Sequence, residues 1–328
     1  MEIGSFIELQ FPDSGEYYSQ YKDIARLNTG RAAIWHATRV LECNTIWIPV
    51  YQCDTVRDFL LKKGMFVKYY NIDEKFNPID IIQEKKQAVL LVNYYGVMSK
   101  KRMEALSKCY MNVIIDNSQA FFSEPINECM NIYSCRKFIG VPDGAYVIGK
   151  NAESHVKEYD KSFSSDTALF MLQRIEYGCE GKAYQSRILN EGRINTEDCM
   201  QMSKLTQTIL AGINYDDIKM KRRKNFEIVS SSLDNVNCIN ATRYYDCDSI
   251  PMVYPLVIED DNLLEKMKKI KHFQGHWWSY LLNEISVDCF EYWLSRYIIP
   301  ITIDQRYKEC EIAELLEKIM LLLYEEKE

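Results

Sequence analysis

The sequence predicts an α/β protein in which a mostly parallel β-sheet, covered by helices, forms a large domain that is followed by a small α+β domain. In the first half, short apolar runs rich in β-branched residues alternate with helical segments of about ten residues, the pattern of repeated β–α units. After about residue 150 polar helical stretches dominate, and from about residue 225 helices and strands mix. We therefore expect a large domain over residues 1–224 and a small one over residues 225–328.

The expected strands of the first half are short and almost wholly apolar, as in strands that are buried on both faces. They are Thr45–Val50, Phe66–Tyr70, Ala88–Asn93, Asn112–Asp116 and Tyr146–Gly149. Helices are expected over Asp54–Lys63, where Asp54 is a candidate N-cap, and over the amphipathic Lys101–Tyr110. The elements expected in the C-terminal part are the strand Met252–Ile258 and the helices Leu263–Lys271 and Ile312–Glu326.

The composition excludes several function classes. The formal net charge is −7 at pH 7, which argues against nucleic acid or an anionic membrane as the main partner. The basic run Lys219–Lys224 is interpreted as a solvated helix face. No apolar run reaches the roughly 18 residues of a membrane span, and the first residues, MEIGSFIELQF, do not resemble a signal peptide. We expect a cytoplasmic protein.

Cysteine and histidine usage argues against a metal site. The 11 cysteines are scattered and the closest pairs lack C-x-x-C spacing, while only four histidines are present. Neither a zinc site nor a disulfide framework is therefore predicted. Reduced thiols in a cytoplasmic protein fit this pattern best.

Two segments suit the binding of a charged cofactor. Ligands of parallel sheets bind outside the carboxyl ends of the strands, and Asp116 directly follows the apolar run NVII. Its carboxylate can pair with a cationic ring nitrogen, bind a metal or simply cap the next helix. Thr29, Gly30 and Arg31 open a helical stretch, where unpaired N–H groups suit a phosphate, although Thr-Gly is also an ordinary helix start.

A third segment, Tyr133–Gly144, places Lys137 among apolar residues and turn formers. A surface lysine is the default interpretation. If Phe138, Ile139 and Val141 surround the amine, however, it is partly desolvated and becomes more nucleophilic. The glycines and the proline that follow allow tight turns that expose it.

Together, in this order and spacing, these segments resemble those of the DegT/StrS family of aminotransferases. That family has the aspartate-aminotransferase-like fold (type I) and uses pyridoxal 5′-phosphate. The resemblance spans about residues 25–150 and resumes at Ile303–Tyr307. The matching segments are Asn28–Ala33 for the phosphate-binding motif, Pro49–Cys53 for the strand-end proline with its aromatic residue, Asp116 with Gln119 for the asp-x-x-gln/his pair, and Lys137 with Asp143 and Gly144 for the lysine motif.

The resemblance implies a role for each matched residue. Lys137 would hold the cofactor as a Schiff base and move protons once displaced, and Asp116 would pair with the pyridinium nitrogen. Gln119 would hydrogen-bond the phenolic oxygen. The other expected cofactor contacts are the phosphate-binding Thr29, Gly30 and Arg31, a ring-stacking residue from the stretch that holds Tyr51 and Cys53, and Ser134, which would replace the family's serine because Ile132 stands at that position. Ala145 stands where the family has a second glycine.

On the substrate side, Asn93, Tyr94 and Tyr95 are expected to line the site, and Arg306 to meet a substrate carboxylate or phosphate unless it pairs with Asp304. Trp277 and Trp278 are interpreted as packing between the small domain and the sheet, with a substrate or dimer surface as the alternative.

The resemblance implies a homodimeric aminotransferase that moves an amino group from glutamate to a keto-sugar nucleotide, in surface-polysaccharide or amino-sugar biosynthesis. A lysine at position 137 argues against the dehydratase branch of the family, where histidine takes this place. Two alternatives stay open: a protein of this fold without transaminase activity, acting as a regulator or scaffold, and a pyridoxal-phosphate enzyme for a non-sugar ketone or an amino acid.

Overall fold

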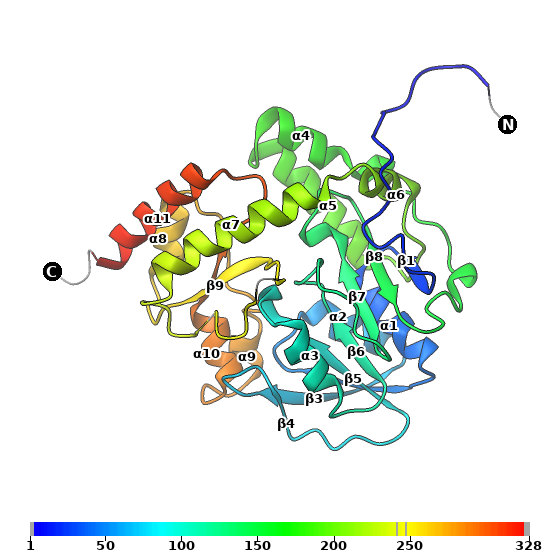
Figure 1. Cartoon of the computed structure of the whole chain (residues 1–328), viewed down its shortest axis with the longest axis horizontal. Helices are drawn as coiled ribbons and strands as arrows, with labels where there is room; N and C mark the ends of the chain where they lie inside the picture. The colour runs from blue at the N-terminus through cyan, green and yellow to red at the C-terminus, as the bar shows by residue number, and fades with distance from the viewer. Residues whose placement is uncertain (1–2, 241, 247, 325–328) are drawn as a thin grey trace.

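A computed structural model describes residues 3–240, 242–246 and 248–324 (Figure 1). Its centre is an eight-stranded sheet with the order β1-β8-β7-β6-β5-β2-β3-β4. The neighbours from β3 through β2, β5 and β6 to β7 are parallel, whereas β8, β1 and β4 pair antiparallel. The strands are β1 (Ile24–Leu27), β2 (Thr45–Pro49), β3 (Phe66–Ile72), β4 (Pro78–Ile79), β5 (Gln87–Val92), β6 (Val113–Asp116), β7 (Met130–Ser134) and β8 (Ala145–Ile148).

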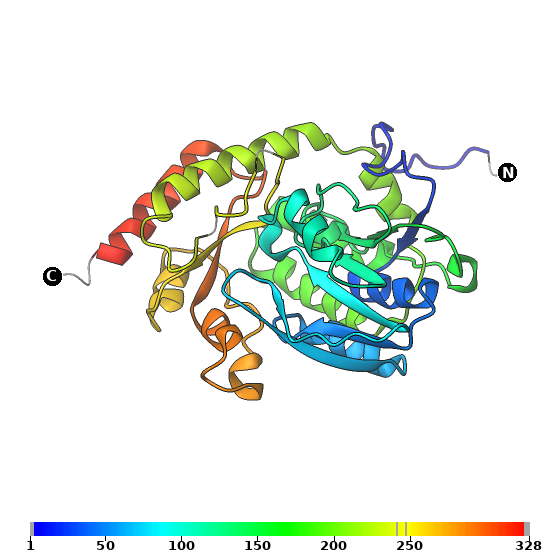
Figure 2. The same cartoon turned by 60° about the horizontal axis from the view of Figure 1, so that its bottom comes forward.

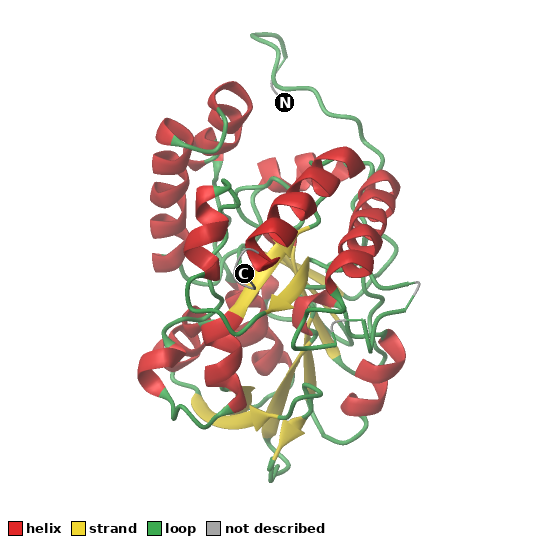
Figure 3. Ribbon diagram, turned by 90° about the vertical axis from the view of Figure 1, so that its left-hand side faces the viewer, coloured by secondary structure: helices red, strands yellow, loops and turns green. Residues whose placement is uncertain are grey.

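Both faces of this sheet are covered, and the alternation of side chains along β5 shows how. Ala88 and Leu90 point into a core shared with α1 (Gly30–Val40) and α2 (Asp54–Lys62). Val89 and Leu91 point into a second core, to which α3 (Lys100–Ser107) and the C-terminal helices contribute. Figure 3 shows strands between helices on either side. The mostly parallel, covered sheet predicted from the sequence is thus confirmed.

The second half contributes a helical hairpin and a small antiparallel sheet. The hairpin consists of α4 (Leu169–Tyr177) and α5 (Gly181–Thr196), at the top of Figure 1. β9 and β10 pair antiparallel, and the yellow-green α7 and the red α11 lie side by side in Figure 2. The remaining elements are α6 (Lys204–Ala211), α7 (Tyr215–Leu233), β9 (Val253–Val257), α8 (Leu263–Lys269), α9 (Leu281–Glu284), α10 (Phe290–Tyr297), β10 (Ile298–Thr302) and α11 (Glu309–Tyr324).

The expected elements occur with small shifts at their ends. The N-cap of α2 is Cys53 instead of Asp54: the backbone of Cys53 is extended, and Asp54 is already helical. The last two residues of the helix expected over Ile312–Glu326 lie outside the described residues. α7 runs without interruption through residues 224 and 225, where the domain boundary is expected. Within the described ranges, no helix is both long and apolar enough to cross a membrane.

Candidate active site

The segments that carry most of the predicted site residues meet at one edge of the sheet. β2, β5, β6 and β7 run parallel, so the residues that follow them leave from the same edge. β1 runs in the same direction as β7, because both pair antiparallel with β8. The turns after these five strands therefore share the edge at which parallel sheets bind their ligands.

The N-terminus of α1 forms one end of the candidate site. Thr29 is the N-cap, and its hydroxyl oxygen accepts a hydrogen bond from the N–H of Ala32 at 3.3 Å. A Cβ atom built on Gly30 would lie 3.3 Å from Oγ of Ser118 and 3.9 Å from Cβ of Ser134. Two hydroxyl side chains thus border the free N–H groups at the positive end of a helix dipole, an arrangement that suits an anion. Ser118, two residues beyond Asp116, is a site residue that the sequence analysis missed.

The side chain of Arg31 faces away from this anion site. Its Nη1 donates to Oδ1 of Asn195 at 3.0 Å, Nη2 bonds the carbonyl of Ile194, and the guanidinium lies over the ring of Phe59. Burial lowers the pKa of this guanidinium. Arg31 therefore anchors α5 to the start of α1, and only its backbone N–H is left for a ligand.

Asp116 ends β6 with a buried carboxylate whose two oxygens both accept hydrogen bonds. Oδ1 accepts from the N–H of Ser118 at 2.9 Å, and Oδ2 accepts from Nε2 of Gln52 at 3.0 Å. The amide of Gln52 is itself oriented, because its Oε1 accepts from the N–H of Cys53 at 3.0 Å. Gln52 was missed by the sequence analysis; its place directly after β2, at the edge where Asp116 lies, was the available signal.

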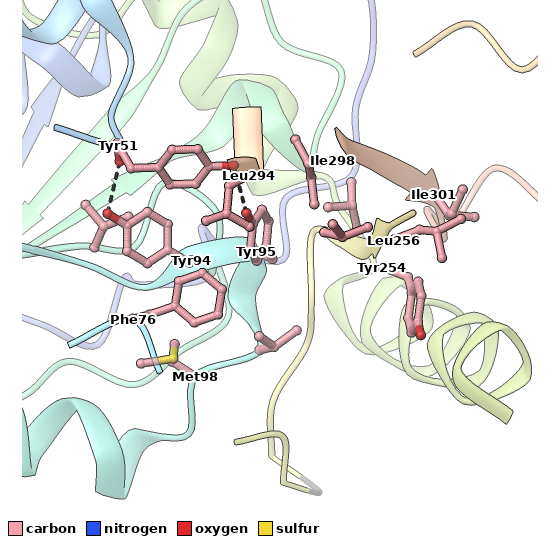
Figure 4. Close-up of a cluster of buried hydrophobic side chains, with 14 of the residues drawn as sticks. Tyr51, Phe76, Tyr94, Tyr95, Met98, Tyr254, Leu256, Leu294, Ile298 and Ile301 are labelled. Carbon is pink, nitrogen blue, oxygen red and sulfur yellow. Dashed lines mark hydrogen bonds between the residues drawn. The ribbon is translucent and has the colours of Figure 1, made fainter. Parts of the chain in front are cut away.

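The three tyrosines expected at the site belong to the core beneath the edge (Figure 4). The hydroxyls of Tyr51 and Tyr95 are 2.9 Å apart, and the hydroxyl of Tyr94 donates to the carbonyl of Tyr51 at 3.0 Å. All three rings are fully buried. In the single chain these rings therefore belong to the core, and a contact of Tyr51 with a cofactor ring and of Tyr94 and Tyr95 with a substrate stays a prediction. Cys53, half-buried at the start of α2, stays a prediction.

The same core explains the tryptophan pair. The indole of Trp277 stacks on the ring of Tyr95 with centroids 5.3 Å apart, and the indole of Trp278 meets Tyr51 edge-on at 4.4 Å. Their interpretation as packing between the C-terminal part and the sheet edge is therefore confirmed. Tyr95 has a left-handed φ of 59°, which is strained for a bulky residue and gives the turn after β5 its shape.

Two amide side chains line the middle of the edge. Oε1 of Gln119 accepts a hydrogen bond from the N–H of Tyr95 at 2.6 Å. Nδ2 of Asn93 donates to Oδ1 of Asn117 at 3.2 Å, whereas its own Oδ1 is buried without a partner in the described structure. An unpaired buried acceptor is costly, so this oxygen marks a place where a ligand donor fits.

Lys137 ends the 3-10 helix η2 (Cys135–Lys137), which directly follows β7. Phe138, Ile139 and Val141 are buried, but Lys137 itself is exposed. The expected desolvation of the amine by these neighbours is thus wrong for a single chain, because their side chains turn into the core beneath the loop. Lys137 forms no ion pair or hydrogen bond with any residue that the structure describes, so its amine is free at the sheet edge.

Arg306 is held by Asp304. Its Nε and Nη2 contact Oδ1 and Oδ2 of Asp304 at 2.8 and 2.7 Å. Burial alone would raise the pKa of Asp304, but the hydrogen bonds and charge of Arg306 outweigh it and lower that pKa. Arg306 thus forms the intradomain ion pair with Asp304, and its contact with a substrate stays a prediction. The loop still belongs near the site, since Nε2 of Gln305 donates to the carbonyl of Phe138 at 2.7 Å.

The architecture is that of the aspartate-aminotransferase-like fold (type I). Solved structures of DegT/StrS aminotransferases have a similar fold, and this is the family that the sequence segments resemble. Similar solved structures are a DegT DnrJ EryC1 StrS aminotransferase from Brucella abortus (12% identity, TM-score 0.58, covering 90% of this chain and 85% of that one), the sugar aminotransferase CalS13 from Micromonospora echinospora (12%, 0.62, 90% and 86%), and an E. coli GDP-4-keto-6-deoxy-D-mannose-3-dehydratase with bound hydrated PLP (13%, 0.61, 90% and 87%). No protein-family profile and no curated protein sequence matches the chain.

The residues at the edge fit pyridoxal phosphate. The N-terminus of α1 with Gly30, Ser118 and Ser134 can hold a phosphate, and Asp116 offers a carboxylate to a ring N–H. Lys137 offers a free amine. Among the described residues, no group of three or more His, Cys, Asp or Glu side chains is arranged to hold a metal ion.

Proposed function

We propose that this chain is a pyridoxal-phosphate-dependent aminotransferase that moves an amino group from glutamate to a keto-sugar nucleotide, in surface-polysaccharide or amino-sugar biosynthesis. One observation carries the proposal. The N-terminus of α1, the carboxylate of Asp116 and the free amine of Lys137 lie at one edge of the sheet, at the ends of β1, β6 and β7.

Each group has a distinct task in such a reaction. Pyridoxal phosphate, when bound, supplies an electron sink for a substrate carbanion. The first N–H groups of α1, with Ser118 and Ser134, bind its phosphate. Asp116, held by Gln52 and by the N–H of Ser118, accepts the hydrogen bond of the ring N–H. Nζ of Lys137 would hold the cofactor covalently and, once the amino group of the substrate has displaced it, would be free to take up a proton and return it.

The names of the similar solved structures support a sugar substrate. CalS13 is named as a sugar aminotransferase, and the E. coli dehydratase is named for a keto-deoxysugar attached to GDP. The resemblance associates a lysine with the transaminating branch and a histidine with the dehydratase branch. Lys137 therefore favours transamination over dehydration.

The surface supports a homodimer. None of the residues of α4 is buried, although the helix is rich in apolar residues. Large exposed apolar residues occur along the hairpin and just before it; they are Phe163, Leu169, Leu172, Ile175, Tyr177, Tyr184, Ile188 and Leu189. α5 also contacts the site segments, through Arg31 and through an ion pair between Glu191 and Arg136, the neighbour of Lys137. A second copy on this hairpin would lie beside Lys137 and shield its amine from water.

An absorption spectrum tests the proposal. Purified protein mixed with pyridoxal phosphate should show a band near ~400–430 nm from the covalent bond to Lys137, and Lys137→Ala should lack it. Glutamate should then remove the band from the wild type, and a keto-sugar nucleotide should restore it.

The same spectra separate the alternatives. A band that glutamate leaves unchanged would identify a cofactor-binding protein without transaminase activity. A band that glutamate removes and only non-sugar ketones restore would identify a different substrate. Absence of any band in the wild type would contradict the enzyme proposal itself.

A further inference from the structure

Arg222 carries a guanidinium that is fully buried without a carboxylate partner. It lies in the middle of α7 and is 2% exposed. No ion pair of Arg222 occurs in the described part of the chain; the carboxylate whose charge acts on it is Asp304, and that group is bound to Arg306. Burial lowers the pKa of Arg222 to about 10, so the group remains charged at neutral pH. A buried cation without a counter-ion is costly, and its neighbours show what it holds.

The contacts of Arg222 converge on the residue that follows Lys137. The guanidinium carbon lies 4.4 Å from the centroid of the Phe138 ring. Nε of Arg222 donates to Oε1 of Gln305 at 2.8 Å, and Nε2 of Gln305 donates to the carbonyl of Phe138 at 2.7 Å. Arg222 and Gln305 together therefore fix both the ring and the carbonyl of Phe138.

The same guanidinium reaches the other side of the site edge. Its Nη1 donates to the carbonyls of Met252 at 3.0 Å and Pro251 at 3.3 Å. The N–H of Met252 in turn donates to the carbonyl of Tyr95 at 2.8 Å, and the N–H of Tyr95 donates to Gln119. One side chain of α7 thus lies between the lysine loop and the turn that carries Tyr95.

We propose that Arg222 is a positioning residue for Lys137, acting through Phe138. The amine of Lys137 forms no hydrogen bond or ion pair with a described residue, so its direction depends on the backbone of the short helix η2. Because Phe138 directly follows Lys137, holding Phe138 in place also holds the backbone from which the lysine side chain extends. The proposal rests on the proposed function for what the amine does, but the bracing exists in the protein without cofactor and is tested there.

The experiment compares three variants with a matched control. Arg222→Met removes the brace, Arg222→Lys keeps only its charge, and Gln305→Leu removes the bond to the carbonyl of Phe138. Lys221→Met is the control, because it removes a positive charge from the same helix at an exposed residue that pairs with Asp217. The first measurement is amide hydrogen exchange of residues 135–139 without cofactor. The second is the rate at which pyridoxal phosphate with cyanoborohydride labels Lys137, compared with the reversible affinity for the same compound.

Arg222→Met and Gln305→Leu should each accelerate exchange of residues 135–139 about tenfold or more. They should slow the labelling of Lys137 by about ten- to a hundredfold while the reversible affinity changes less than about threefold, since the phosphate is held by α1. Lys221→Met should change neither quantity. Arg222→Lys should show the same changes in both rates as Arg222→Met. An ammonium cannot replace a planar guanidinium that stacks on a ring and bridges two segments.

Wild-type exchange and labelling in Arg222→Met would overturn the proposal. So would full restoration by Arg222→Lys, since charge alone would then suffice. If Arg222→Met does not fold, Gln305→Leu decides the question. If the wild type binds no pyridoxal phosphate, the proposed function fails, whereas the exchange rates of residues 135–139 still support or overturn the brace.

Discussion

The two ends of the candidate site are built in different ways. At the phosphate end, Asp116 and Ser134 end neighbouring strands, Ser118 lies two residues after Asp116, and all three are buried, with Gly30 at the start of α1 beside the two serines. At the lysine end, Lys137 is exposed and the residue after it is held by side chains far away in the sequence. The phosphate end is therefore complete within the sheet, whereas the lysine end depends on the C-terminal part. The predictions below test this contrast.

The largest effect is expected at the phosphate end, from the substitution Asp116→Asn. The amide keeps the size of the side chain but removes the negative charge that would face the ring N–H, so kcat/KM for glutamate should fall about 10³-fold. Stopped-flow measurement of the first half-reaction checks this. Glu104→Gln, on the neighbouring helix α3, is the control and should have no effect. Asp116→Asn with wild-type rates would show that the charge is not used.

The second prediction concerns the pH dependence of the unfolding free energy and involves α1, the helix at the phosphate end. His36 on α1 is buried, with Nδ1 2.8 Å from the Tyr159 hydroxyl and Nε2 2.8 Å from the carbonyl of Ala152. Burial is the main reason that its pKa falls from 6.5 to about 4. The unfolded chain therefore binds a proton between pH 6.5 and 4 that the folded chain does not, and stability is lost as the pH falls through this range. One such histidine accounts for about 3 kcal/mol between pH 7 and pH 4.

Urea unfolding at pH 7 and pH 4.5 measures this loss. His36→Gln should reduce the difference in unfolding free energy between the two pH values by about 2 kcal/mol. Burial also lowers the pKa of His272, in the C-terminal part, to about 4. His272→Gln should therefore leave the contribution of His36 in place. Equal pH dependence in His36→Gln and the wild type would contradict the assignment.

The third prediction concerns the dependence of the lysine end on a second copy. Ile175→Glu with Leu189→Glu places two charges on the exposed apolar face of the hairpin. The dimer dissociation constant should rise about a hundredfold or more, because both charges must be desolvated at the interface. Sedimentation velocity across a concentration series measures it. Leu61→Glu, an exposed leucine on α2, is the matched control. A wild type that sediments as a monomer at all concentrations would refute the homodimer.

The smallest effect is expected from Gly30→Ala. The added methyl group would lie 3.3 Å from Oγ of Ser118, tight enough to displace this hydroxyl, so the affinity for pyridoxal phosphate should fall about tenfold. Gly192→Ala in α5 is the control, because a Cβ atom there meets nothing within 4 Å. Equilibrium dialysis of both variants, with thermal unfolding as a stability check, gives the comparison. Equal affinities would place the phosphate elsewhere.

The same contrast explains what could be predicted from the sequence. Asp116 and Gly30 follow recognisable strands or open a recognisable helix, so their position at the sheet edge was predictable. Gln52 directly follows β2 and was predictable in the same way. Arg222 was not, because it acts on a residue distant in the chain. A position directly after a strand also does not tell where the side chain points. The ring of Tyr51 turns into the core for this reason, whereas the amide of the next residue reaches the site.

α7 has a mechanical consequence. A helix of 19 residues is roughly 28 Å long, and α7 contains no proline or glycine at which it could bend. If the C-terminal part moved against the sheet, α7 would therefore move as one rigid helix. α7 begins after the turn at Gly212–Asn214, which the segment around Pro12 packs against. Arg222 lies on this helix and contacts Phe138, so a displacement of α7 would also displace the loop that carries Lys137.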